Sequence, residues 1–312
     1  MKVLHFLLAV LLLTACERHK VYQHNEGMVF GTVYNITYQS NDNLQAEIEA
    51  ALREVDLEFS MFNDSSTVAR INRGETPELS PMYQEVYDLA QYVNHETNGA
   101  FDITVAPLVN AWGFGFKHSD MPTQEQVDSL LKIRDMLDFS AIAKGYGCDV
   151  VARLLNSHGI KNLMVEIGGE VVVRGENPDG QAWRVGVTKP IEDSLSLDTP
   201  IQAVLNITEC GMATSGNYRN FYYKDGRMFA HTIDPRTGYP VQHELLSATV
   251  VANDCATADA FATAFMVLGL DSARSILQQH KELEAYFIYT SPDNRYNTWA
   301  SPGLRDMIAN GR

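Results

Sequence analysis

An aspartate and a threonine four residues apart are the first pair in this sequence that could do chemistry. Asp259 and Thr263 lie in an apolar stretch whose pattern predicts a helix, so their side chains would share one face. A carboxylate and a hydroxyl are hard oxygen ligands of the kind that Mg²⁺ prefers. A helix cap by the Asp and a bond from the Thr to the helix backbone would explain the same pair, so spacing alone leaves both interpretations open.

A lysine among small residues marks a second candidate, in the segment LDFSAIAKGYG at 137–147. The pattern predicts a turn that leads into a helix. Unpaired N–H groups and the positive end of the dipole make a helix N-terminus attractive to phosphate, and Lys144 would add a point charge. A tightly packed helix entry with an exposed lysine is the structural alternative.

Two other segments combine glycines with aromatic or acidic residues. The segment GAFDITVAPLVNAWGFG at 99–115 could wall a flat aromatic ligand, although core packing is the commoner role of Trp and Phe. The segment EIGGE at 166–170 has two glycines within a strand pattern, which indicates a bulge or a close approach of the backbone.

A histidine precedes a predicted turn in the segment HTIDPRTGYP at 231–240. His231 with Asp234 could position or deprotonate a hydroxyl, or the histidine could be purely structural. Upstream, TSGNYR at 214–219 offers hydroxyls and an arginine for phosphate, or a polar surface turn. The common templates for dinucleotide, nucleoside-triphosphate, zinc-protease and serine-hydrolase sites are absent.

The elements that must position these residues are helices alternating with strands. Helical periodicity and caps predict helices at 44–59, 81–97, from Thr123, 143–157 and 254–268. β-Branched and aromatic runs predict strands near 28–38, 163–174, 183–189, 201–208, 228–233, 246–252 and 285–290, and an exposed loop at 190–200. The mixture predicts the α+β class, as a single compact domain of mixed sheets and helices whose strand order cannot be read.

The N-terminus resembles a bacterial lipoprotein signal. An apolar run from Val3 to Leu13 is too short to span a hydrocarbon layer of roughly 30 Å, and Leu13-Thr14-Ala15 precedes Cys16 as in a lipobox. We expect a signal peptide at 1–15, lipidation of Cys16, a tether at 16–26 and a catalytic domain at 27–312. An ordinary secretory signal is the alternative.

Charge and cysteine content narrow the class further. A formal charge of −15 argues against a surface that binds nucleic acid or anionic lipid, so an anionic ligand would need a metal or a few placed basic groups. Cys148, Cys210 and Cys255 lack the spacing of a zinc site, and we expect them to be buried small residues, with one optional disulfide left open.

Taken in order, these segments resemble the ApbE family, the FAD:protein FMN transferases or flavin transferases. The match covers nearly the whole chain after the signal. Its motifs are MVFGTVY at 28–34, FSMF at 59–62, GAFDITVAPLVNAWGFG, LDFSAIAKGYGCD, EIGGE, TSGNYR, HTIDPRTGYP and ADAFATA at 258–264.

The resemblance implies a fold related to the T-fold and a Mg²⁺-dependent transfer of FMN from FAD to a Thr or Ser hydroxyl, with release of AMP. It implies Asp259, Thr263 and the carbonyl of Ala141 as metal ligands. The positions where the family contacts FAD are Met28, Phe62, Ala100, Phe101, Asp102, Asp138, Lys144 and Ile233. The implied acceptors are flavoprotein subunits of membrane respiratory complexes.

Two positions depart from the family pattern. Phe62 stands where relatives carry a tyrosine, and Asn217 where the family often has aspartate. The first change bears on contacts to the nucleotide, and so on the balance between transfer and hydrolysis. For the transfer itself we expect Mg²⁺ and Lys144 to stabilise the diphosphate charge, while His231, or failing it Asp234, orients or deprotonates the acceptor hydroxyl. A Mg²⁺-dependent FAD pyrophosphatase and a non-catalytic flavin-binding lipoprotein are the competing hypotheses.

Overall fold

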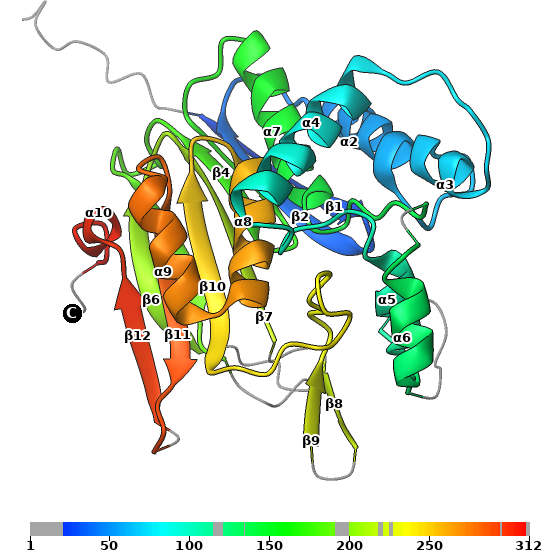
Figure 1. The fold of residues 1–312 in the computed structure, drawn as a ribbon. Helices are drawn as coiled ribbons and strands as arrows, with labels where there is room; N and C mark the ends of the chain where they lie inside the picture. The colour runs from blue at the N-terminus through cyan, green and yellow to red at the C-terminus, as the bar shows by residue number, and fades with distance from the viewer. Residues whose placement is uncertain are drawn as a thin grey trace, which may run out of the picture.

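A large antiparallel sheet forms the centre of the molecule (Figure 1). The computed structural model describes residues 21–114, 121–133, 135–190, 200–217, 221–224, 227–293 and 295–309. Within them eight strands form one sheet in the order β1-β2-β3-β4-β7-β10-β11-β12, with every neighbouring pair antiparallel. These strands are β1 (Tyr22–Val29), β2 (Thr32–Gln39), β3 (Leu163–Ile167), β4 (Glu170–Arg174), β7 (Cys210–Gly216), β10 (Leu245–Ala252), β11 (Glu284–Thr290) and β12 (Tyr296–Ala300).

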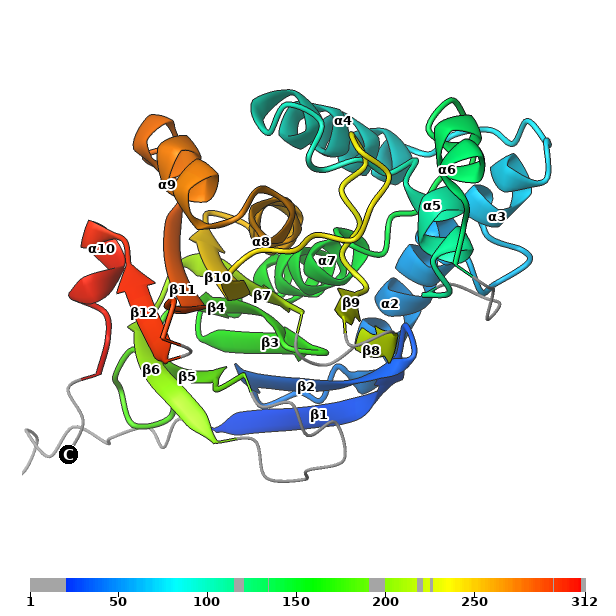
Figure 2. The same ribbon diagram turned by 60° about the horizontal axis from the view of Figure 1, so that its bottom comes forward.

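Helices cover one face of this sheet, as the turned view in Figure 2 shows. Helices α7 and α8 pack directly on the strands, α2 packs on α7, and α4 packs on α8. The helices are α2 (Gln45–Phe59), α3 (Thr67–Asn72), α4 (Pro81–Glu96), α5 (Ala106–Ala111), α6 (Gln124–Leu130), α7 (Ala143–Ser157), α8 (Cys255–Leu268), α9 (Leu270–Gln279) and α10 (Pro302–Arg305). The helical layer thus brings α7 and α8 side by side over the middle of the sheet.

Two hairpins complete the fold. Strands β5 (Trp183–Thr188) and β6 (Ile201–Ile207) pair with each other, and their apolar side chains share a core cluster with β4, β7, β10 and β11. The second hairpin, β8 (Phe221–Lys224) and β9 (Arg227–Ala230), projects from the body in Figure 1. The β5–β6 hairpin therefore covers strands of the sheet on the side away from α7 and α8.

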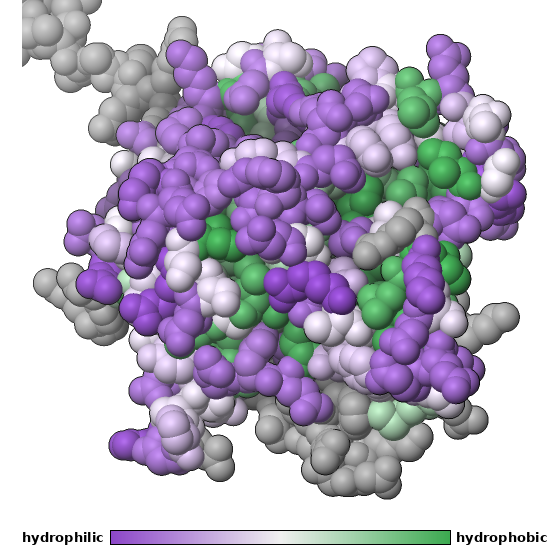
Figure 3. Space-filling view, in the orientation of Figure 1, coloured by the Kyte–Doolittle hydropathy of each residue, from purple (hydrophilic) through white to green (hydrophobic). Residues whose placement is uncertain are grey.

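The surface is mostly hydrophilic on the face drawn in Figure 3, with hydrophobic residues visible near its centre and towards its right-hand side. No helix in the described ranges is long and apolar enough to cross a membrane. Cys148, Cys210 and Cys255 are buried and free in the described structure, which confirms the expectation of buried small residues.

The contact between α7 and α8 depends on small residues. An added Cβ at Gly145 would lie 2.4 Å from the carbonyl oxygen of Cys255, and one at Gly211 of β7 would lie 2.3 Å from the Cys255 nitrogen. No side chain fits at either place without moving backbone. Two glycines therefore let the start of α8 approach both α7 and the sheet at backbone distance.

All five predicted helices are confirmed, including the capping box of Thr123 and Gln126 and the bounds of α7. Two predicted strands were wrong in extent, because each is a pair joined by a tight turn. Phe30 and Gly31 join β1 to β2 with φ of 52° and 74°, and Gly168 and Gly169 join β3 to β4 with φ of 64° and 107°.

The segment EIGGE therefore contains a hairpin turn and not a bulge, because both of its glycines adopt left-handed backbone. The close approach that the sequence suggested is present: a Cβ on Gly168 would lie 2.8 Å from Thr32 Cγ2. The signal peptide, Cys16, the first part of the tether (16–20), Tyr218, Arg219 and nearly all of the 190–200 loop fall outside the described residues. Residues 22–26, predicted to belong to the tether, lie in β1.

Candidate active site

Two adjoining cavities run between the helical layer and one end of the sheet. We call them the wide cavity, of about 1020 Å³, and the narrow cavity, of about 480 Å³, and together the cleft. Five residues line both and so mark the junction: Val109, Asp138, Ser140, Lys144 and His231.

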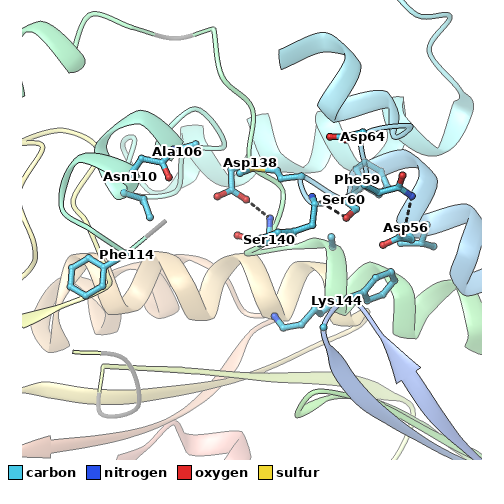
Figure 4. A pocket seen from close by; sticks show the side chains of 18 of the residues that line it. Asp56, Phe59, Ser60, Asp64, Ala106, Asn110, Phe114, Asp138, Ser140 and Lys144 are labelled. Atoms are coloured by element: carbon cyan, nitrogen blue, oxygen red, sulfur yellow. Dashed lines mark hydrogen bonds between the residues drawn. The ribbon is translucent and has the colours of Figure 1, made fainter. Parts of the chain in front are cut away.

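The wide cavity has largely apolar walls from three parts of the chain. The end of α2 and the residues after it supply one wall, α5 supplies another, and the β1–β2 turn contributes Phe30 and Gly31. Figure 4 shows Lys144 reaching into this space, with Asn110 and Phe114 to one side and Phe59 and Ser60 to the other. Phe62 lies at the rim with 83% of its surface exposed. Such walls suit a flat aromatic group.

The narrow cavity is lined by the polar groups of the predicted site. Ala141, Lys144, Asp259 and Thr263 all contribute to its wall, together with the β3–β4 turn and the end of β7. Helix periodicity explains the last pair, since residues four apart on α8 face the same side. The structure thus brings the three predicted metal ligands to one cavity with the predicted phosphate-binding lysine.

Lys144 lies between two buried carboxylates. Its Nζ is 3.1 Å from Glu170 Oε1 and 3.8 Å from Asp259 Oδ2, and its side chain is 29% exposed while theirs are 6% and 3% exposed. Burial alone would lower the pKa of Lys144, but the charges of Asp259 and Glu170 outweigh it and raise the pKa above its ordinary value. Lys144 is therefore a permanent cation at neutral pH.

The two carboxylates respond to the same burial. Burial raises the pKa of Glu170 to about 7, against the attraction of Lys144, and it also raises the pKa of Asp259. Glu170 Oε2 is buried and has no hydrogen-bond partner among the described residues. An orphaned carboxylate oxygen beside a second buried carboxylate creates a site that favours a cation or a hydrogen-bond donor.

The donors fit Mg²⁺ by their chemistry. Asp259 Oδ2 accepts a 3.1 Å hydrogen bond from the Gly145 backbone N–H, which orients the carboxylate, and Thr263 Oγ1 lies 3.1 Å from Ser215 Oγ. The described residues contain no cluster of three His, Cys, Asp or Glu side chains that would hold a metal. One carboxylate, one hydroxyl and one backbone carbonyl, with other positions left to water and phosphate, is nevertheless a set that Mg²⁺ accepts.

His231 and Asp234 occupy different surroundings. His231 lines both cavities and meets the ring of Phe114 edge-on, at 6.4 Å between centroids. The carboxylate of Asp234 accepts two 2.8 Å bonds from the Arg236 side chain and one of 2.9 Å from its backbone N–H. The described lining residues of neither cavity include Asp234. Geometry therefore favours His231 for contact with a ligand, with Asp234 holding the turn.

The other residues predicted to contact FAD lie in three kinds of surroundings: the cavity wall, the buried core and the exposed surface. Asp138 and Asp102 line the narrow cavity, as do Ala100, Phe101 and Ile233, although these last three are at most 4% exposed. Met28 is 71% exposed and stands outside both described linings, near the β1–β2 turn. The binding roles of all these residues stay predictions.

Sequence reasoning assigned no role to Glu170, Ser140 or Asn110. Glu170 was visible only as the residue after the glycine pair in EIGGE, and its link to Lys144 arises from the packing of α7 on the β3–β4 turn. Asn217, one of the two departures, is 6% exposed and accepts a 2.5 Å bond from Thr232 Oγ1. It therefore ties the end of β7 to the segment that carries His231.

Comparison with known proteins shows which family the chain resembles. The sequence model of the ApbE family matches residues 30–287. The FAD:protein FMN transferase of Vibrio cholerae is 34% identical over 97% of this chain and 98% of its own, and that of Escherichia coli is 32% identical over 91% and 88%.

Solved structures agree as well. The flavin transferase ApbE from Vibrio cholerae superposes with a TM-score of 0.82 at 33% identity, over 92% of this chain and 99% of its own. The flavinyl transferase ApbE from Pseudomonas stutzeri gives 0.81 at 28% identity, over 94% and 98%. The resemblance carried by the motifs and the predicted α+β class are both confirmed, and the chain belongs to the ApbE family.

Proposed function

We propose that this chain transfers FMN from FAD to a threonine or serine hydroxyl of an acceptor protein, forming a phosphoester and releasing AMP. The observation that carries it is the junction of the two cavities, which Lys144 and His231 both line, next to Asp259 and Thr263 in the narrow cavity. Relatives that match nearly the full chain are named FAD:protein FMN transferase.

The cleft suits a dinucleotide with a charged centre. Its wide cavity offers apolar walls for a ring system, and its junction offers the Lys144 ammonium for a diphosphate. The chain carries a formal charge of −15, so this placed cation matters for an anionic substrate. Lys144 is the one lysine or arginine among the described lining residues of the cleft. A cation held beside it by Asp259 and Thr263 would offset the two carboxylates, so the junction is where the cleft would favour phosphate.

Mg²⁺ would be held by Asp259, Thr263 and the carbonyl of Ala141. When bound, it would neutralise charge on the diphosphate oxygens as a Lewis acid. Lys144 adds a second positive charge, kept in place by Glu170. These groups stabilise the negative charge that develops as the diphosphate is cleaved.

His231 takes the acceptor proton in this scheme. The acceptor oxygen forms a bond to the phosphorus of the FMN half, the bond from that phosphorus to the bridging oxygen breaks, and the bridging oxygen leaves on AMP. The hydroxyl proton moves to the imidazole of His231, because a neutral imidazole is a suitable general base. The position of His231 at the junction supports this role.

The test uses the chain begun after Cys16, incubated with FAD, Mg²⁺ and an acceptor flavoprotein domain. An intact mass of the acceptor that gains one FMN phosphoester, and loses the gain with EDTA or in Asp259→Ala, is the expected result. Free FMN and AMP without acceptor labelling would instead identify a pyrophosphatase. FAD returned unchanged, with a second acceptor also unlabelled, would identify a flavin carrier.

The N-terminal sequence supports an exported and lipid-anchored enzyme facing the periplasm, with acceptors in membrane respiratory complexes. Leu13-Thr14-Ala15 before Cys16 is the pattern on which this depends. We expect the native protein to sediment with membranes and Cys16→Ser to lose its lipid mass. Recovery of unmodified Cys16 from membranes would contradict the anchor.

A further inference from the structure

Helices α7 and α8 each supply a carboxylate that accepts hydrogen bonds from backbone N–H groups at the N-terminus of the other helix. Asp259 of α8 accepts from the Gly145 N–H in the first turn of α7, at 3.1 Å. In return, Asp149 of α7 accepts from the Cys255 N–H at 2.9 Å and from the Ala256 N–H at 2.9 Å, in the first turn of α8. Each helix thus satisfies N–H groups that the other leaves unpaired.

These hydrogen bonds connect the two helices that carry the residues predicted to bind Mg²⁺ and phosphate. Ala141 and Lys144 stand at the entry of α7, whereas Asp259 and Thr263 stand on α8. The spacing between these helices is set by backbone contact at Gly145, where a Cβ would lie 2.4 Å from the Cys255 oxygen. A small slide of α8 would therefore change the distances from Asp259 and Thr263 to Ala141 and Lys144.

Asp149 is placed to prevent that slide. It is 8% exposed, it lies one helical turn beyond Gly145, and both of its oxygens bond to α8 backbone. The other acceptor at the start of α8 is Asp254, which bonds to the Thr257 N–H at 2.8 Å but belongs to the same segment as that helix. Asp254 therefore stabilises α8, whereas Asp149 fixes α8 relative to α7.

We propose that Asp149 is a positioning residue, which holds Asp259 and Thr263 in register with Ala141 and Lys144 so that Mg²⁺ and a diphosphate can bind between the helices. This role rests on the proposed function. Mg²⁺ demands near-ideal octahedral geometry, so a shift of a few tenths of an ångström lowers affinity. Partners that orient metal ligands typically contribute about 10–100-fold to affinity.

Asp149→Asn and Asp254→Ala make a matched pair. The first replaces one carboxylate oxygen by an NH2 group, which cannot accept a hydrogen bond, and the second removes the N-cap acceptor of α8. We expect each to lower Tm by roughly 2–5 °C. Only Asp149→Asn should raise the Mg²⁺ concentration for half-maximal FMN transfer, by about tenfold or more, with most of kcat recovered at saturating Mg²⁺.

A second readout does not require turnover. Calorimetric titration of the FAD-free protein with Mg²⁺ should show weaker binding in Asp149→Asn by a similar factor and near-normal binding in Asp254→Ala. An equal shift in both variants, or an unchanged Mg²⁺ midpoint in Asp149→Asn, would overturn the positioning role. If that variant does not fold, Asp149→Glu serves instead, because its longer side chain keeps the charge but displaces α8, and an unchanged midpoint would again contradict the idea.

The two hypotheses fail differently. A wild-type chain that labels no acceptor and cleaves no FAD would contradict the proposed function, and the calorimetric Mg²⁺ titration would still test Asp149. A wild-type chain that labels its acceptor, with identical Mg²⁺ dependence in all three proteins, would overturn only the role of Asp149.

Discussion

The Nζ of Lys144 lies 3.1 Å from Glu170 Oε1, and this ion pair joins the first turn of α7 to the first residue of β4. Asp259 stands on the other side of the ammonium at 3.8 Å. When Glu170 and Asp259 are both ionised, the two carboxylates carry one more charge than the single ammonium of Lys144 balances. An arriving cation would neutralise that charge, so the cluster favours metal binding even though it contains a lysine.

Removing the charge of Glu170 tests how strongly its ion pair with Lys144 stabilises the fold. Breaking a buried ion pair typically costs about 3–5 kcal/mol of unfolding free energy. We expect Glu170→Gln to cost less than this, because Asp259 still faces Lys144 and because burial already disfavours the charged form of Glu170. Lys144→Met should also destabilise. Urea unfolding of the double variant should recover at least ~1 kcal/mol relative to the sum of the single effects, and strict additivity would show that the pair is not coupled.

A methyl group at Gly145 should push α8 away from α7. Alanine normally favours a helix over glycine by about 1 kcal/mol, but here its Cβ would lie 2.4 Å from the Cys255 oxygen, so overpacking should dominate. We expect Gly145→Ala to lose about 2–3 kcal/mol of stability. Gly186→Ala is the control, since its Cβ would meet Ile201 Cδ1 at an ordinary 3.4 Å. Equal thermal unfolding of the two variants would contradict the close contact.

Local patterns predicted the helices better than the sheet. Helix α8 is a continuous apolar stretch whose two ends are marked by Asp254 and Gly269, and Gly159 follows the end of α7. The turn of β1 and β2 escaped notice because Phe30, at φ of 52°, is an unusual residue for left-handed backbone. Strand β7, CGMATSG, contains few residues that favour strands. It pairs with β4, from which the β5–β6 hairpin separates it in sequence, so local patterns could not predict this pairing.

The residues of the candidate site also differ in whether local sequence patterns could predict them. Asp259 and Thr263 could be found because helical spacing places them on one face. Glu170 and Asp149 could not, because their partners Lys144 and Cys255 are brought to them only by packing of separate elements. The choice between His231 and Asp234 likewise required coordinates, since the Arg236 side chain engages only the second.

Substitutions of His231 and Asp234 should therefore have different effects on kcat. If His231 accepts the hydroxyl proton, His231→Ala should lower kcat for FMN transfer by about 100-fold or more, with FAD affinity changed less than about threefold. Asp234→Asn loosens a turn held by Arg236 and should lower kcat less than tenfold while reducing Tm. A larger kcat loss in Asp234→Asn than in His231→Ala, measured with saturating acceptor, would reverse the assignment.

Phe62 offers a test of FAD binding that folding does not obscure. Its ring is 83% exposed at the rim of the wide cavity, so truncation removes little from the core. Stacking of a base on an aromatic ring is worth about 1–3 kcal/mol, and we expect Phe62→Ala to raise the FAD dissociation constant about 5–100-fold with Tm unchanged. Phe62→Tyr should retain binding. Leu57→Ala, which removes an exposed apolar side chain of α2 that is not among the described lining residues, is the control. Flavin fluorescence titration measures all four proteins, and equal affinity in Phe62→Ala and Leu57→Ala would place the flavin nucleotide away from this rim.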